Sequence, residues 1–188
     1  MKGVYEEGNY TAASSNSEFA ELRAYLLSKL MWNPNIDFDK EMNGFLKAYY
    51  GDGWQYVREY IDMTSENTGE EPTHNIIYSS MLNPGVLLLT NNEVKYMDDL
   101  WANAKELCKN DWQLRNIKLS ELSWRYWKGC NMKSEFSRFQ MPEIWQSENK
   151  QLYNNFRAAG ITKFSEQKIL TENPDFTKPP FTWGVKPG

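Results

Sequence analysis

The chain has 188 residues and a formal net charge of -4 at pH 7, so it lacks the basic excess that is typical of a nucleic-acid binder. Hydrophobic residues make up 40% and charged residues 24%, which is ordinary for a globular protein with a sizeable core. The sequence has no apolar run near the roughly 18 residues that a membrane span needs.

Residues 1–15 are expected to be the end of an upstream domain or a linker. The opening MKGVYEEGNY has no apolar h-region, so it does not form a signal peptide. Lys2 to Tyr10 favour a short strand, which resembles the end of a strand inside a longer chain. We therefore expect Met1 to be an artificial start and sequence upstream of it to be missing.

Residues 16–53 carry the strongest helical periodicity, as two helix patterns joined by Asn33-Pro34. Asn16 or Ser17 can cap the first helix. Its apolar face is predicted from residues spaced by three and four, namely Phe19, Leu22, Leu26 and Leu30. A second set widens this face and indicates a helix packed on more than one side: Ala20, Ala24, Leu27 and Met31.

The second helix is predicted to be capped by Asp37 and to end at Gly51 in a left-handed conformation. Its expected apolar face consists of Phe38, Met42, Phe45, Leu46 and Tyr49. A third helix begins near Gly53 and runs to about Glu66. Arg58 and Asp62 are four residues apart in this helix and can pair.

The later chain continues with helical patterns. Thr90 and Glu93 have the spacing of a capping box, and a helix face then extends as far as Cys108. Asp111 is predicted to cap the next helix, which ends near Gly129. A further helix starts at Met141-Pro142 and ends at Gly160.

Together these patterns predict a mainly α fold, a compact bundle of five to six helices over residues 16–160. A short extended segment precedes the helices. Residues 161–188 are expected to form an irregular, Pro-rich tail that packs on the helical domain. Ile161 to Phe164 favour a short strand, and Pro174, Pro179 and Pro180 are expected to prevent a helix after it.

Three segments in this order, ELRAYLLSKLMWNP, FLKAYYG and YVREYID, resemble the domain of unknown function DUF4838. The similarity is best over Gly3 to Ile61 and returns weakly at AAGITKFSE, Ala158 to Glu166. This resemblance implies a module that follows a barrel similar to that of α-glucuronidases and related glycoside hydrolases. It also implies a bacterial protein that is secreted or periplasmic.

Glu6 and Glu7 are the first candidates for contact with a sugar substrate. Adjacent residues of a strand point to opposite faces, so the two carboxyls cannot themselves be an acid and nucleophile pair. One of them could face the C-terminal rim of a barrel. A hydrolase would need one of them together with a distant acid, such as Asp52 or Asp62.

Aromatic residues are the second candidates, because sugar C–H groups pack on exposed rings. The sequence brings Trp124, Tyr126 and Trp127 close together and places Tyr49-Tyr50 before Gly51. Core packing explains most of these rings. Trp127 and Trp183 stay as candidate substrate-binding residues because the pattern fixes their burial least.

Other catalytic and ligand-binding patterns are weak. His74 is the sole histidine, in a charged loop, and the two cysteines have no C-x-x-C spacing, so we expect no metal or other cofactor. Whether Cys108 and Cys130 form a disulfide stays open.

These observations favour a non-catalytic helical module that supports an upstream barrel and could edge its substrate cleft. The alternatives are a glycan-binding module with exposed Trp or Tyr rings, a hydrolase that uses Glu6 or Glu7, and an oligomerising helical adaptor.

Overall fold

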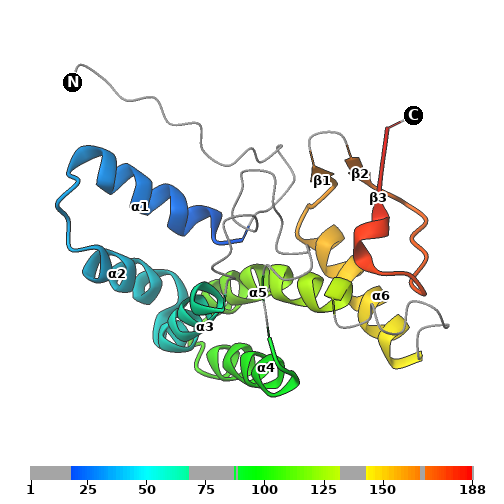
Figure 1. The fold of residues 1–188 in the computed structure, drawn as a ribbon, viewed down its shortest axis with the longest axis horizontal. Coiled ribbons are helices and arrows are strands. Elements are labelled where there is room, and N and C mark those ends of the chain that lie inside the picture. Colours follow the sequence, from blue (N-terminus) through cyan, green and yellow to red (C-terminus); the bar gives the residue numbers. More distant parts are fainter. Residues whose placement is uncertain (1–17, 68–86, 88, 132–142, 166–167, 188) are drawn as a thin grey trace. The chain divides into compact units, whose positions relative to one another are not determined.

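The structure is a computed structural model that describes residues 18–67, 87, 89–131, 143–165 and 168–187. It is mainly α, as predicted, with helices α1 to α6 and one small sheet (Figure 1). The chain divides into two compact units, with the boundary between Glu121 and Leu122 inside α5. Within the described ranges, no helix is both long and apolar enough to cross a membrane. The strand expected at Lys2 to Tyr10 lies outside these ranges.

Helix α1 spans Ala20–Trp32 and begins later than the pattern predicted. Phe19 has φ of 50° and stands outside the helix, although the sequence placed it on the apolar face. Leu22 and Leu26 are buried, so this part of the predicted face is confirmed. The expected caps at positions 16 and 17 lie outside the described residues.

Helix α2 spans Phe38–Tyr50 and has the predicted N-terminal cap. Gly51 ends the helix with a positive φ, as predicted, but its ψ of -142° lies outside the left-handed helical region. The side chain of Asp37 accepts a hydrogen bond from the backbone N–H of Lys40 at 3.0 Å. Gly51 has φ of 65°, which glycine adopts without steric cost, and its N–H donates to the carbonyl of Lys47. These contacts satisfy backbone groups that a helix end otherwise leaves unpaired.

The buried face of α2 is turned relative to the prediction. Met42 and Leu46 are buried as expected, but Tyr50 completes the core row. Its hydroxyl lies 2.7 Å from that of Ser120 in a hydrogen bond. Phe38 is 46% exposed, so its assignment to the core face was wrong.

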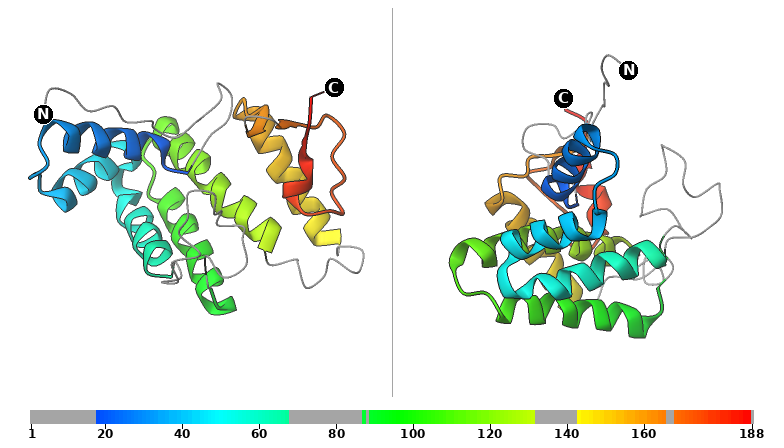
Figure 2. Two further views of the ribbon diagram at one scale, coloured as in Figure 1. Left: turned by 45° about the horizontal axis from the view of Figure 1, so that its top comes forward. Right: turned by 90° about the vertical axis from the view of Figure 1, so that its left-hand side faces the viewer.

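A short 3-10 turn, η1 (Gly51–Gly53), leads from α2 into α3 (Trp54–Glu66). Helix α3 packs against α2 and α4 (Figures 1 and 2). The predicted pair between Arg58 and Asp62 is present, with Nε donating to both carboxylate oxygens at 2.9 Å. Arg58 also donates to Asn43 and Asp39, which ties α3 to α2.

Helix α4 spans Asn91–Glu106 and begins with the predicted capping box. The hydroxyl of Thr90 accepts from the N–H of Glu93, whose carboxylate accepts from the N–H of Thr90 at 2.7 Å. Gly53 lies so close to this helix that an added Cβ would stand 2.5 Å from the carbonyl oxygen of Ala104. The turn before α3 therefore requires glycine at this position.

Helix α5 spans Asp111–Asn131. The N-terminal cap was predicted at Asp111, one residue too late. The side chain of Asn110 forms the cap and accepts a hydrogen bond from the backbone N–H of Gln113 at 2.9 Å. The first unit spans Glu21–Glu121, and its core is built from α2 to α5. Its largest fully buried side chains are Leu46, Tyr50, Val57, Tyr60, Met97, Leu100, Trp101 and Ile117.

The second unit contains the end of α5, helix α6 (Glu143–Ala158) and a three-stranded antiparallel sheet. Strands β1 (Lys163–Ser165), β2 (Lys168–Leu170) and β3 (Gly184–Val185) lie in that order. Ile169 pairs with Val185. The strand predicted near Ile161 to Phe164 is thus present as β1, whereas β2 and β3 were not predicted.

The C-terminal tail is held on α6 by buried polar contacts. The Nδ2 of Asn149 donates to the carbonyls of Phe176 and Lys178 at 3.0 and 3.3 Å. Tyr153 donates to the carbonyl of Thr171 at 2.6 Å. The prediction that prolines prevent a helix was wrong for one turn, because Pro180–Trp183 form the 3-10 helix η3, whose first residue needs no N–H donor.

Candidate functional site

Several sequence candidates lie where the structure gives no description. Glu6, Glu7 and His74 fall outside the described residues. The proposed sugar contacts of the two glutamates therefore stay predictions.

The two tryptophans proposed as substrate contacts are buried in the second unit. Trp183 is 0% exposed and Trp127 is 5% exposed, and the Trp127 ring stacks on Trp124 at 5.1 Å between centroids. Trp183 contacts Tyr153 and Phe156 edge to face. Both rings therefore belong to the core of this unit, and the sugar contacts proposed for them stay predictions.

Two acids considered as distant catalytic groups are engaged in ion pairs. The carboxylate of Asp52 lies 2.5 Å from Nζ of Lys109, and Asp62 is held by Arg58. In the described ranges, no group of three or more His, Cys, Asp or Glu side chains could hold a metal ion. Cys108 and Cys130 are both free thiols, and burial raises the pKa of Cys108.

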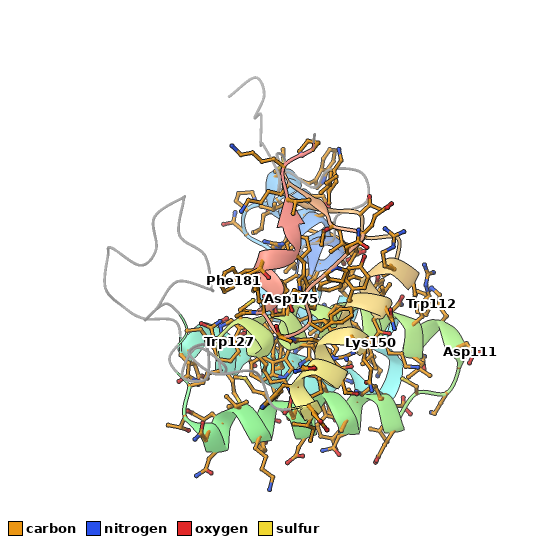
Figure 3. All side chains as sticks on the ribbon, turned by 90° about the vertical axis from the view of Figure 1, so that its right-hand side faces the viewer. Asp111, Trp112, Trp127, Lys150, Asp175 and Phe181 are labelled. Atoms are coloured by element: carbon orange, nitrogen blue, oxygen red, sulfur yellow. The ribbon has the colours of Figure 1, made fainter. Side chains whose placement is uncertain are left out.

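The most prominent aromatic surface of the first unit is a run of four partly exposed rings, which we call the aromatic strip: Tyr25, Phe45, Tyr49 and Trp112. Tyr25 comes from α1, Phe45 and Tyr49 from one side of α2, and Trp112 from the first turn of α5. Centroid distances along the strip are 5.2, 5.2 and 5.5 Å. Trp112 is 52% exposed and stands beside Asp111 at the start of its helix (Figure 3).

Hydrogen bonds hold two of the four residues of the strip. Tyr25 donates to the carboxylate of Glu41 at 2.5 Å, and Lys29 lies 3.2 Å from the same oxygen. Farther along the strip, buried Asn116 of α5 donates to the backbone carbonyl of Tyr49 at 3.0 Å. The rings are therefore held in place by contacts between three helices.

Charged groups of both signs border the strip. The hydrogen bond from Tyr25, followed by that from Lys29, lowers the pKa of Glu41. Burial raises the pKa of Tyr49, and the charge of Glu21 raises it further, whereas that of Arg115 opposes the shift. The side chains of Glu21 and Arg115 are both exposed.

A second uncovered surface lies on α1. The outer face of α1, defined as Ala24, Leu27 and Met31, has exposed fractions of 42% for Leu27 and 48% for Met31. Trp32 follows at the end of the helix and is 92% exposed. The sequence indicated that α1 packs on more than one side, but in this structure its second apolar side is open to solvent.

Sequence reasoning singled out Tyr49 but missed Tyr25, Phe45 and Trp112 as surface aromatics. Phe45 and Tyr49 are four residues apart, which places them in one row of α2. This spacing was interpreted as core. Trp112 stands between the polar residues Asp111 and Gln113 in the first turn of α5. A large ring among polar residues could have indicated an exposed aromatic side chain.

Comparison with known proteins gives one match. The model of the family described as "Domain of unknown function (DUF4838)" matches residues 1–62. The predicted resemblance to DUF4838 is confirmed over these residues, which contain α1, α2 and the outer face of α1. Neither the curated proteins nor the solved structures provide a match.

Proposed function

We propose that this chain is a non-catalytic helical module of a larger glycoside-hydrolase-like protein. In that protein it supports a neighbouring barrel domain and edges the substrate cleft. The expectation of a bacterial protein that is secreted or periplasmic belongs to the same proposal. The match to DUF4838 over residues 1–62 supports the family part of this reasoning.

The outer face of α1 carries the proposal. Ala24, Leu27 and Met31 are spaced by three and four residues, so they form one stripe along the helix. Such spacing is typical of a helix that buries this stripe against another element. Full burial of a large apolar side chain contributes about 1.5–3 kcal/mol, so covering Leu27, Met31 and Trp32 would stabilise an interface between domains.

The size of the natural polypeptide tests this proposal. An antibody raised against this chain, which has a mass of 22.1 kDa, is used to detect the protein in the cells and culture medium of its source. We expect a much larger polypeptide that also contains the barrel. A natural polypeptide that ends at the mass of this chain would overturn the proposal.

Substitution on the outer face tests the supporting role. In the natural polypeptide, we expect Leu27→Glu to lower the melting temperature of the neighbouring domain, because a charge would be placed in the interface. Ile144→Glu is the matched control, since Ile144 is 67% exposed and lies on α6. Equal effects of the two substitutions would argue against a specific contact at α1.

A further inference from the structure

We propose that the aromatic strip binds an uncharged polysaccharide chain, with Trp112 as the main contact. This inference concerns α2 and α5 as well as α1 and does not depend on the supporting role proposed above. It assigns a ligand class to a surface that contains none of Glu6, Glu7, Trp127 and Trp183.

The ring arrangement is the first reason. Four aromatic side chains from three helices remain partly exposed and lie in a row with centroids 5.2 to 5.5 Å apart. In the same unit Tyr50, Tyr60 and Trp101 are fully buried, and the rings of Trp32, Phe38 and Tyr96 are exposed outside this row. The electron-rich face of an aromatic ring attracts groups with a positive edge. The C–H groups on the flat side of a pyranose are such groups. Phe45 and Tyr49 stack on one another, so the sugar is expected to pack mainly on Trp112, which is 52% exposed, with the other rings beside it.

Rigidity is the second reason. Phe45 and Tyr49 are inclined by 20° to one another, and Trp112 meets Tyr49 at 73°. The hydrogen bonds of Tyr25 to Glu41 and of Asn116 to Tyr49 hold the helices that carry these rings. A surface that is already ordered loses little conformational entropy when it binds.

The border charges decide the class of glycan. Glu41 is balanced by Lys29 at the Tyr25 end of the strip, and the exposed charges of Glu21 and Arg115 act on Tyr49 with opposite signs. Asp111 adds a further negative charge beside Trp112 (Figure 3). These groups supply both donors and acceptors for sugar hydroxyls, but they do not supply the cationic excess that a polyanionic chain would need.

The strip also differs from the outer face of α1. The outer face is a stripe of small and flexible aliphatic residues, which suits a neighbouring helix. The strip consists of rings with polar groups around them, which is the composition of ligand-binding surfaces. The two surfaces are therefore assigned different occupants. Trp112 in the strip and Trp32 after the outer face are both exposed, so each surface can be tested separately.

Affinity gel electrophoresis of the full chain tests the inference. The gels contain hydroxyethyl cellulose, mixed-linkage β-glucan, arabinoxylan, galactomannan or polygalacturonate, with a gel free of polysaccharide as reference. We expect slower migration in at least one neutral polysaccharide. Trp112→Ala should weaken this binding about tenfold, equivalent to about 1.4 kcal/mol. Trp32→Ala is the control and should bind like the unmodified chain, since Trp32 is exposed outside the strip.

A second variant guards against an effect of Trp112→Ala on folding. Arg115→Gln removes a charged donor at the border, keeps the rings, and should weaken binding while the circular dichroism melt stays unchanged. Migration that no neutral polysaccharide slows would overturn the inference, as would binding confined to polygalacturonate. It would also fail if Trp112→Ala bound as well as the unmodified chain, or if sedimentation showed that Trp112 joins two copies of the chain.

Discussion

The side-chain Nδ2 of Asn116 donates to the backbone carbonyl of Tyr49 at 3.0 Å, which joins α5 to the last turn of α2. Asn116 is 4% exposed, and its loss would leave the carbonyl of Tyr49 without this donor. We expect Asn116→Ala to lower the free energy of unfolding by about 1–3 kcal/mol. Urea denaturation followed by circular dichroism measures this change.

Asn92→Ala is the control for this substitution. Asn92 is exposed in the first turn of α4, and a surface change of this kind usually stays within about 0.5 kcal/mol. If both variants unfold at the same urea concentration, the hydrogen bond does not stabilise the contact between α2 and α5.

Two glycines of the first unit should respond in opposite directions to alanine. An added Cβ at Gly53 would lie 2.5 Å from the backbone oxygen of Ala104, so we expect Gly53→Ala to destabilise the unit by about 1–3 kcal/mol. At Gly44, inside α2, nothing lies within 4 Å of the added atom. Gly44→Ala should therefore stabilise the chain by about 0.5–1 kcal/mol. Thermal melts of the two variants check both signs, and a stable Gly53→Ala variant would contradict the close approach of η1 to α4.

The contact between Tyr25 and Glu41 predicts a pH dependence. The hydrogen bond from Tyr25, then that from Lys29, lowers the pKa of Glu41 in the folded chain. The resulting stabilisation is fully present above the pKa that the carboxyl has in the unfolded chain. It is lost as pH falls through the lower pKa of the folded state. Tyr25→Phe should therefore melt earlier than the unmodified chain at pH 7, and the difference should disappear in acid.

An NMR titration of the Glu41 carboxyl isolates this effect from other acids. Tyr25→Phe should move the pKa of Glu41 upward, toward its ordinary value, because the largest cause of the shift is removed. An unchanged Glu41 pKa in the variant would mean that Lys29 alone holds the carboxylate.

Asn149 is expected to control the attachment of the C-terminal tail. It is 1% exposed and donates to two tail carbonyls, those of Phe176 and Lys178. Asn149→Leu should release the tail, and cleavage by a protease within residues 171–187 should become faster. Asn154→Ala, at an exposed position of α6, is the control. Equal cleavage rates in all three proteins would contradict the role of this side chain.

Local features of the fold were predictable because they depend on residues close in sequence. Asp37 caps α2 through a contact three residues away, and Thr90 and Glu93 form their capping box over the same separation. The match to DUF4838 likewise follows a continuous stretch.

Features that depend on distant residues were harder to predict. Periodicity could not distinguish the burial of Tyr50 from that of Phe38. Tyr50 is buried and its hydroxyl is hydrogen-bonded to that of Ser120, whereas Phe38 of the same helix is exposed. The pairing of Ile169 with Val185 in a sheet of very short strands left too weak a pattern to recognise. The aromatic strip combines α1, α2 and α5, so no single segment indicated it.

We propose that the outer face of α1 contacts another domain of the natural protein. Hydroxyl-radical footprinting followed by mass spectrometry would compare Leu27, Met31 and Trp32 in this chain and in the natural polypeptide. We predict strong labelling of all three in the chain alone, where Trp32 is 92% exposed, and marked protection in the natural polypeptide. Ile144 should be labelled equally in both. Equal labelling of Leu27, Met31 and Trp32 in the two proteins would contradict the claim.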